Sequence, residues 1–241
     1  MGNKNVLVTG GAGGLGLEIA RKHLDMGDRV MVLGPREKSG LTKLMADYGN
    51  VSFIKCDISR TDDVQVALKD LASSIDKLDY MYACAGIYRF SERNAKLPDV
   101  VLDDAASMFD INAVGFLRVC QVLLHTIRDG SVIMCITSEA GSIGESSRDK
   151  EYSYCMSKAA ENMACVILQN HFNSDEIKAR VMCIHPGWLR TEMGGPDAFA
   201  NPQYSVAPED SADGIISIAL DIENIPKEHM YMDYKRMLIG W

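Results

Sequence analysis

The sequence has 241 residues, 47% of them hydrophobic, which is long enough for one domain with a substantial buried core. A formal net charge of −8 at pH 7, without any basic cluster, argues against a nucleic-acid-binding surface. No apolar run approaches the roughly 20 residues that span a membrane, and no signal-peptide pattern opens the chain, so we expect a cytoplasmic protein with no membrane partner.

The chain opens with the pattern of strand, glycine-rich turn and helix. Residues 5–9 are apolar and β-branched, as in a buried parallel strand, and residues 17–24 have the helical spacing of apolar side chains. Five of the seven residues 10–16 are glycines. Glycine lets the backbone approach a pyrophosphate, and a helix N-terminus offers free N–H groups, so the pattern predicts a dinucleotide site.

Two registers of this turn fit known fingerprints. Gly11-x-Gly13-x-x-Gly16 matches the general dinucleotide pattern, and Thr9-Gly10-x-x-x-Gly14-x-Gly16 matches a narrower one. A glycine-rich turn without a ligand is the alternative, although so many glycines would needlessly destabilise an ordinary loop.

The second predicted strand, 29–33, ends without the acid that usually binds the ribose of NAD. Gly34-Pro35-Arg36 occupies that place. An acid there would repel a 2′-phosphate, whereas Arg36 is able to pair with one. The sequence therefore favours NADP(H) over NAD(H), with a solvated surface arginine as the alternative for Arg36.

The rest of the chain alternates between short apolar runs and amphipathic helices. This alternation predicts an α/β fold, a Rossmann-type doubly wound parallel sheet of about seven strands with helices on both faces, as a single domain over 1–241. A long irregular stretch, 189–207, is expected to be a substrate lid, with simple disorder as the alternative. Further strands are expected at 51–56, 78–84, 131–136, 179–184 and 229–232, and helices near 41–48, 61–75, 100–127, 152–172 and 208–220.

Polar residues follow the predicted strands at the edge where parallel sheets bind ligands. Ser138 follows the strand 131–136, and Tyr154 and Lys158 lie in the helix from 152. Residues four apart share one helix face. A free tyrosine has a pKa of about 10, and a nearby ammonium lowers it toward neutrality. The Tyr154–Lys158 pair therefore predicts a general acid/base.

The seven cysteines indicate buried, reduced thiols. They form no Cys-x-x-Cys pair and no grouping with metal-ligand spacing, so we predict no metal site. A catalytic thiol at Cys155, beside Tyr154, is the alternative.

In order and spacing, these motifs resemble those of the short-chain dehydrogenase/reductases over essentially the whole chain. Segments 141–143, 185–191 and 208–212, together with Trp241, look most like the branch of C-signal and sniffer-type carbonyl reductases. The matching pieces are the glycine turn, Asp57, Ala85-Gly86, Asn112, Ser138, Tyr154-x-x-x-Lys158, Pro186-Gly187 and Thr191.

The resemblance implies specific roles. Tyr154 would exchange the proton on the substrate oxygen, Lys158 would lower the tyrosine pKa and bind the nicotinamide ribose, Ser138 would hold the carbonyl, and Asn112 would position a water. The alternative for Asp57 is a helix cap or turn residue, and the alternative for Asn112 is an exposed asparagine in the middle of a helix. Cofactor contacts are implied at Gly10, Gly13, Gly14, Leu15, Gly16, Arg36, Asp57, Ile58, Ala85, Gly86, Tyr154, Lys158, Pro186, Gly187 and Thr191.

Two departures from the family pattern affect these expectations. Cys84 stands where the family usually has an asparagine before Ala85-Gly86, which puts cofactor affinity in question. Ser138 and Tyr154 lie sixteen positions apart, more than is usual, so Ser142 is a rival for the catalytic serine. We prefer Ser138 because it directly follows a strand.

The sequence therefore predicts an NAD(P)-dependent oxidoreductase that acts on a small-molecule carbonyl or secondary alcohol. The resemblance also implies a homodimer or homotetramer built on the helices around 104–127 and 152–172. The main alternative is an NAD(P)-binding signalling protein with little catalysis. A sugar-nucleotide epimerase would need an additional substrate region that this chain lacks.

Overall fold

The computed structural model describes residues 3–241, which form a seven-stranded sheet in the order β3-β2-β1-β4-β5-β6-β7. Every neighbouring pair is parallel, which confirms the predicted Rossmann-type sheet. The strand order reverses between β1 and β4, the place where such sheets bind ligands at their carboxyl ends. The strands are β1 (Asn5–Thr9), β2 (Arg29–Gly34), β3 (Val51–Lys55), β4 (Tyr80–Ala83), β5 (Val132–Ile136), β6 (Arg180–His185) and β7 (Tyr231–Asp233).

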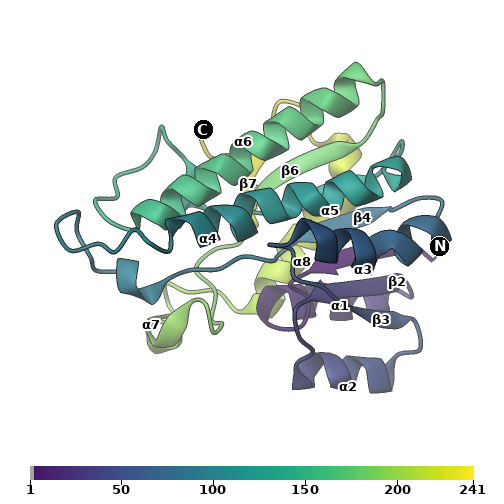
Figure 1. Cartoon of the computed structure of the whole chain (residues 1–241), viewed down its shortest axis with the longest axis horizontal. Coiled ribbons are helices and arrows are strands. Elements are labelled where there is room, and N and C mark those ends of the chain that lie inside the picture. Colours follow the sequence, from purple (N-terminus) through teal and green to yellow (C-terminus); the bar gives the residue numbers. More distant parts are fainter. Residues whose placement is uncertain (1–2) are drawn as a thin grey trace.

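Helices cover both faces of the sheet (Figure 1). Helices α3 (Thr61–Ser74), α5 (Gly115–Leu123) and α6 (Tyr152–Ser174) pack on one face, and α1 (Gly14–Asp25), α2 (Ser39–Asp47) and α8 (Pro208–Leu220) pack on the other. Strand β1 contributes side chains to the hydrophobic cores on both faces of the sheet. Leu7 packs in the core under α3, α5 and α6, and Val6 and Val8 pack in the core under α1, α2 and α8. Short 3₁₀ helices span Phe90–Glu92, Leu124–Thr126, Glu139–Gly141 and Ile222–Asn224.

The helix expected over 100–127 is interrupted. It starts as α4 (Ala105–Phe109), widens into a π-helical turn over Asp110–Val114 and continues as α5. The N–H of Gly115 donates to the carbonyl of Asp110, five residues back. Such π-turns are frequent at functional sites, and this one holds Asn112, in agreement with the poor helix propensity of asparagine.

The run Ala105–Thr126 is the one helical stretch of residues 3–241 that passes a membrane-span test of length and composition, with a mean hydropathy of 1.3 and 44% of the tested window buried. The expectation that no apolar run approaches this length is therefore wrong. Its apolar character has a local explanation, because Phe116, Val119 and Leu123 of α5 are buried in the core.

The segment 189–207 is more regular than expected. It contains α7 (Gly195–Ala200), and Leu189 and Val206 form a parallel bridge that closes its base. The Ser205 hydroxyl donates to the Ala198 carbonyl at 2.6 Å, which fastens the segment to its own helix. Phe199 and Tyr204 nevertheless remain exposed. The segment is therefore a folded flap with two exposed aromatic side chains.

Candidate active site

The side chains predicted to be catalytic lie around the carboxyl end of β5. Ser138 follows this strand and starts a short 3₁₀ helix, where its Oγ accepts a hydrogen bond from the Ala140 N–H at 3.2 Å. The same hydroxyl donates to Oε2 of Glu139 at 2.7 Å. Helix α6 passes the same edge and carries Tyr154 and Lys158 in its first two turns.

Tyr154 is half-buried and touches an aromatic neighbour. Its ring meets that of Tyr88 edge to face, with 5.1 Å between the centroids. Burial raises the pKa of Tyr154, while the Lys158 charge and hydrogen bonding with Ser138 act to lower it. Lys158 thus acts in the predicted direction, but the net shift in this structure is upward because burial outweighs it.

Lys158 is almost fully buried beneath the tyrosine. Its Nζ donates to the Ile136 carbonyl at 3.0 Å and to Oε2 of Glu161 at 2.7 Å. Burial acts to lower the pKa of Lys158, but the negative charge of Glu161 and the neighbouring Tyr154 outweigh burial and raise it. The ammonium form is therefore the stable one here.

Asn112 is completely buried and connects three segments, which excludes the exposed alternative. Its Oδ1 accepts from the Ile87 N–H at 2.7 Å, and its Nδ2 donates to the Ile87 carbonyl and to Oγ of Ser157, both at 3.0 Å. A Cβ added at Gly86 would lie 3.3 Å from Asn112 Oδ1 and 3.6 Å from Lys158 Nζ. Gly86 thus allows the amide and the ammonium to converge after β4.

The rival serine, Ser142, serves a different contact. Its hydroxyl donates to the Gly240 carbonyl at 2.6 Å and accepts from the Glu145 N–H at 3.1 Å. These bonds attach residues 142–145 to the C-terminal segment. The local geometry therefore favours Ser138 as the residue that faces Tyr154.

The glycine turn after β1 fits a phosphate-bearing cofactor. Gly13 precedes α1 and makes no side-chain cap, and the first turn of the helix holds no acidic residue. The backbone N–H groups of that turn are therefore suited to an anion. Gly10 and Gly14 have positive φ angles of 68° and 53°, and a Cβ at Gly16 would come within 2.8 Å of the Gly10 carbonyl oxygen.

Two side chains border this turn. Lys38 lies beside Gly13 and pairs with Glu192 at 2.9 Å, and Thr191 lies against Gly14. Thr191 therefore brings the flap 189–207 to the glycine turn. Arg36 lies exposed two residues after the end of β2.

The other expected cofactor residues have clear structural contacts of their own. The Ala85 N–H donates to Oγ1 of Thr9 at 3.2 Å, which joins the ends of β4 and β1. Asp57 accepts hydrogen bonds from the N–H and the hydroxyl of Ser59, which are the contacts expected if Asp57 is a turn residue. Leu15 and Ile58 are buried, the Pro186 carbonyl accepts from Ser211 at 2.8 Å, and Gly187 has a φ of 82°.

Two acidic residues of the site have no counterpart in the predictions from sequence. Glu139 contacts Ser138 and also lies 3.1 Å from Nδ1 of His185, while Arg148 pairs with it from the loop before α6. Glu161 holds Lys158. The contact of Glu161 could have been predicted from sequence, because a residue three positions after Lys158 shares its helix face. Glu139 directly follows Ser138 in the sequence.

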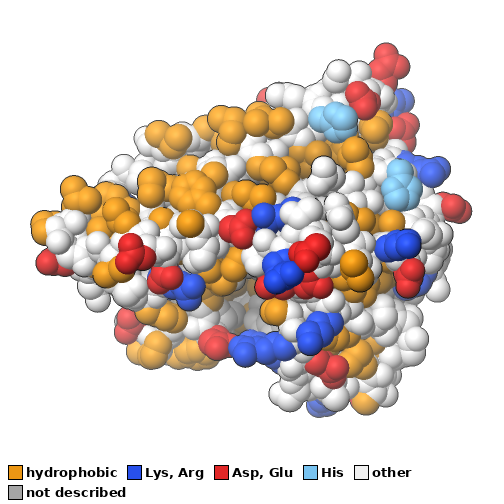
Figure 2. Space-filling view, in the orientation of Figure 1, with side chains coloured by type: hydrophobic (Ala, Val, Ile, Leu, Met, Phe, Trp, Pro, Cys, Tyr) orange, Lys and Arg blue, Asp and Glu red, His pale blue; other side chains and the backbone are white. Residues whose placement is uncertain are grey.

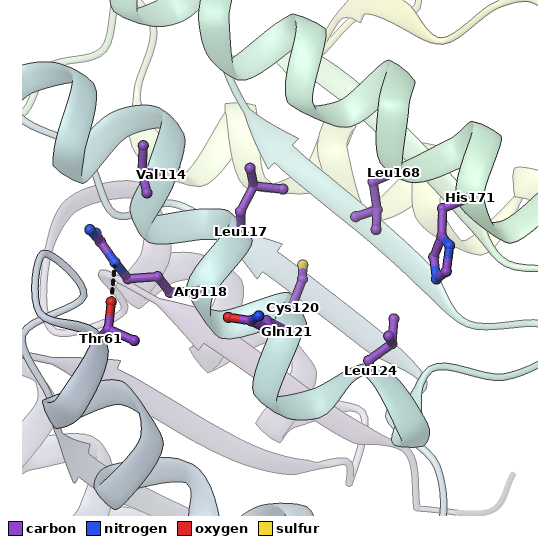
Figure 3. A pocket seen from close by; sticks show the side chains of 9 residues that line it. All are labelled: Thr61, Val114, Leu117, Arg118, Cys120, Gln121, Leu124, Leu168 and His171. Atoms are coloured by element: carbon purple, nitrogen blue, oxygen red, sulfur yellow. Dashed lines mark hydrogen bonds between the residues drawn. The ribbon is translucent and has the colours of Figure 1, made fainter.

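A separate groove lies on the outer side of α5 and α6, and none of its lining residues is a predicted site residue (Figure 3). Its volume is about 490 Å³, and the side chain of Arg118 closes one end by donating to Thr61 at 3.0 Å. Hydrophobic side chains gather along α4, α5 and α6 on this face (Figure 2). The groove is lined by Thr61, Val114, Leu117, Arg118, Cys120, Gln121, Leu124, Leu168 and His171.

Comparisons with known proteins found similar sequences and similar folds. The family model described as short chain dehydrogenase matches residues 4–199. C-signal of Myxococcus xanthus is 34% identical over 149 residues, which cover 60% of this chain and 83% of that protein.

Solved structures match over the whole chain. Carbonyl reductase Sniffer of D. melanogaster has a TM-score of 0.85 at 19% identity, covering 100% of both chains. A carbonyl reductase from Pseudomonas aeruginosa PAO1 in complex with NADP has a TM-score of 0.81 at 25% identity, again over 100% of both chains. These likenesses confirm the predicted fold and the predicted similarity to C-signal and Sniffer.

Proposed function

The chain belongs to the short-chain dehydrogenase/reductase family, and on that premise we propose that it transfers hydride between a nicotinamide cofactor and a carbonyl or secondary alcohol carbon. The observation that carries the proposal is the meeting of Ser138, Tyr154 and Lys158 at the carboxyl edge of a sheet whose first strand ends in the glycine turn. This edge is where open parallel sheets bind their ligands.

In the reductive direction, the substrate oxygen gains negative charge as its carbon accepts the hydride. The nicotinamide, when bound, supplies that hydride. Ser138 has a hydroxyl with which to donate a hydrogen bond to the oxygen, and the Tyr154 phenol gives it a proton. The buried ammonium of Lys158 stabilises the phenolate that remains. In the oxidative direction, the same phenolate takes the proton from the alcohol.

The glycine turn and Thr191 would hold the pyrophosphate, and Lys158 the nicotinamide ribose. Two of the three N–H donors of Lys158 Nζ face Ile136 and Glu161, which leaves the third for a ribose hydroxyl. We further propose NADP(H) as the preferred cofactor. Three observations support this preference: no acid occupies residues 34–36, Arg36 and Lys38 are basic, and the Pseudomonas relative binds NADP.

We also propose that the α5–α6 face joins copies of the chain in a homodimer or homotetramer. Met163 and Ile167 of α6 are exposed, and so is Val114, which ends the π-helical turn before α5 and lines the groove. Such a set of apolar side chains is more typical of a protein interface than of a free surface. Sedimentation of the parent and of Ile167→Glu would test this, with a smaller assembly expected for the variant.

The test of the proposed function is the oxidation of NADPH and of NADH, measured separately against aldehydes, ketones and diketones. We expect turnover with at least one carbonyl, faster with NADPH. A folded protein that binds either cofactor and turns over none of these substrates would contradict the reductase proposal. That result would favour the signalling alternative, which the likeness to C-signal supports.

A further inference from the structure

Glu161 is the least expected side chain of the site. It lies one helical turn after Lys158 on α6, is only 1% exposed, and its Oε2 accepts from the lysine ammonium at 2.7 Å. Burying a carboxylate is costly unless it is paired, and a pair of buried charges often adds little net stability. A role in the chemistry of its partner would explain why a carboxylate occupies this position.

The spacing on α6 relates Glu161 to the tyrosine as well as to the lysine. Tyr154, Lys158 and Glu161 follow one another by four and three residues, so they share one face of α6. Seven residues separate the first from the last, about 10 Å along the helix axis. The negative charge of Glu161 therefore acts on Tyr154 against the positive charge of Lys158.

We propose that Glu161 is a positioning residue that holds the Lys158 ammonium and offsets its charge, so that Tyr154 stays a phenol. The phenol is the form that donates a proton to the substrate oxygen. This site would accordingly favour carbonyl reduction over alcohol oxidation. The inference rests on the proposed function and adds a preferred direction to it.

The other charges near the tyrosine are weaker candidates for this effect. Glu139 also acts to raise the pKa of Tyr154, but it is partly exposed and shared with Arg148 and His185. Glu161 is fully enclosed, so solvent screens its charge less. The remaining titratable groups that face the Tyr154–Lys158–Glu161 row are Tyr88, Cys84, Cys135, Cys165 and Cys183.

The negative charge of Glu161 increases as the pH rises into the alkaline range. Burial raises its pKa to about 8, and the Lys158 charge acts in the opposite direction. The carboxyl is therefore about half ionised at pH 8 and about nine-tenths ionised one pH unit higher, in the range where a tyrosine begins to lose its proton. The charge offset is greatest under the conditions in which alcohol oxidation needs the phenolate.

The direct test is an ultraviolet titration of the Tyr154 phenolate in Glu161→Gln. The phenolate signal is the difference between each protein and its counterpart that also carries Tyr154→Phe. Removing a charge about 10 Å away at an effective dielectric constant of about 20 should lower the tyrosine midpoint by about one pH unit. Glu161→Leu removes the same charge without an amide and should shift the midpoint in the same direction.

The matched control is Asp175→Asn, which removes one negative charge from the exposed far end of α6. It lies about 30 Å along the helix from Tyr154 and should leave the midpoint unchanged. An unchanged or higher midpoint in both Glu161 variants would overturn the proposal.

A second readout follows the reaction. The pH profile of kcat/KM for alcohol oxidation should move down by about one pH unit in Glu161→Gln, which a merely structural role would not do. The titration needs no turnover. A shifted tyrosine midpoint in a protein without turnover would therefore contradict the reductase proposal but support the charge offset by Glu161. Turnover without any shift of the midpoint would support the reductase proposal but contradict the charge offset.

Discussion

Tyr82 and Tyr154 lie in polar clusters of different kinds, one closed and one partly open to solvent. Tyr82 of β4 is fully buried, and its hydroxyl lies 2.8 Å from Nε2 of His23, whose Nδ1 lies 2.7 Å from Asp28. Each polar group of that cluster has a protein partner. Tyr154 is half-buried near Ser138, so solvent reaches part of its side chain.

Burial raises the pKa of both tyrosines, so burial alone does not distinguish a structural from a reactive one. The difference lies in the neighbours. Tyr154 has a buried ammonium within its helix, whereas Tyr82 has a histidine whose own pKa is lowered by burial. The comparison teaches that a charged partner and an open side mark the reactive residue.

The largest effect in this comparison should come from the two serines of the open region. Ser138→Ala removes a donor to the substrate oxygen and should lower kcat by about 10²-fold. Ser142→Ala removes only a bond to the Gly240 carbonyl, so kcat should stay within about twofold of the parent. Steady-state kinetics of both variants measure this. Equal losses in the two would remove the preference for Ser138.

A smaller effect, on stability, is expected from a substitution in the closed cluster of Tyr82, His23 and Asp28. Asp28→Ala leaves His23 and the Lys4 N–H without their carboxylate acceptor. An unsatisfied buried group costs about 1–3 kcal/mol, so the free energy of unfolding should fall by that amount. Urea denaturation measures the loss, and unchanged kinetics would accompany it. A loss of turnover in a folded variant would contradict the structural assignment.

The smallest effect should appear in the pH dependence of stability. Burial lowers the pKa of His23, although Asp28 acts to raise it, so the unfolded chain takes up a proton at a higher pH than the folded protein. The contribution to stability is therefore complete above about pH 6.5 and is lost as the pH falls through the pKa of the folded state.

His23→Gln should make this acid loss shallower, as urea midpoints between about pH 8 and about pH 5 would record. The loss should not vanish, since burial also lowers the pKa of His185. An unchanged slope in the variant would show that His23 does not titrate differently on folding.

The sheet could be predicted from sequence because its strands are short apolar runs between turn residues. Residues 5–9 form β1 as expected, and 208–220 form α8. The only sequence signal for the π-turn was Asn112, a residue with poor helix propensity. Its widened hydrogen bonding depends on packing, such as the close approach of Gly115 to Ile58. Helix α7 is too short and too rich in glycine and proline to give a helical pattern.

The candidate site divides in the same way. Ser138, Tyr154 and Lys158 follow from strand ends and helix spacing, which are properties of the chain alone. The contacts of Glu139 with His185 and of Ser142 with Gly240 join residues far apart in sequence. Such contacts depend on how β5, β6 and the C-terminal segment pack, and no local pattern encodes them.

The most direct measurement compares Tyr154→Phe with Tyr82→Phe in the same carbonyl-reduction and urea-denaturation experiments. We predict that Tyr154→Phe lowers kcat/KM by at least about 10²-fold while it still binds cofactor and keeps its stability. Tyr82→Phe should keep kcat/KM and lose about 1–3 kcal/mol of unfolding free energy, because His23 loses its partner. Retained turnover in Tyr154→Phe, or loss of cofactor binding in that folded variant, would contradict the role assigned to Tyr154.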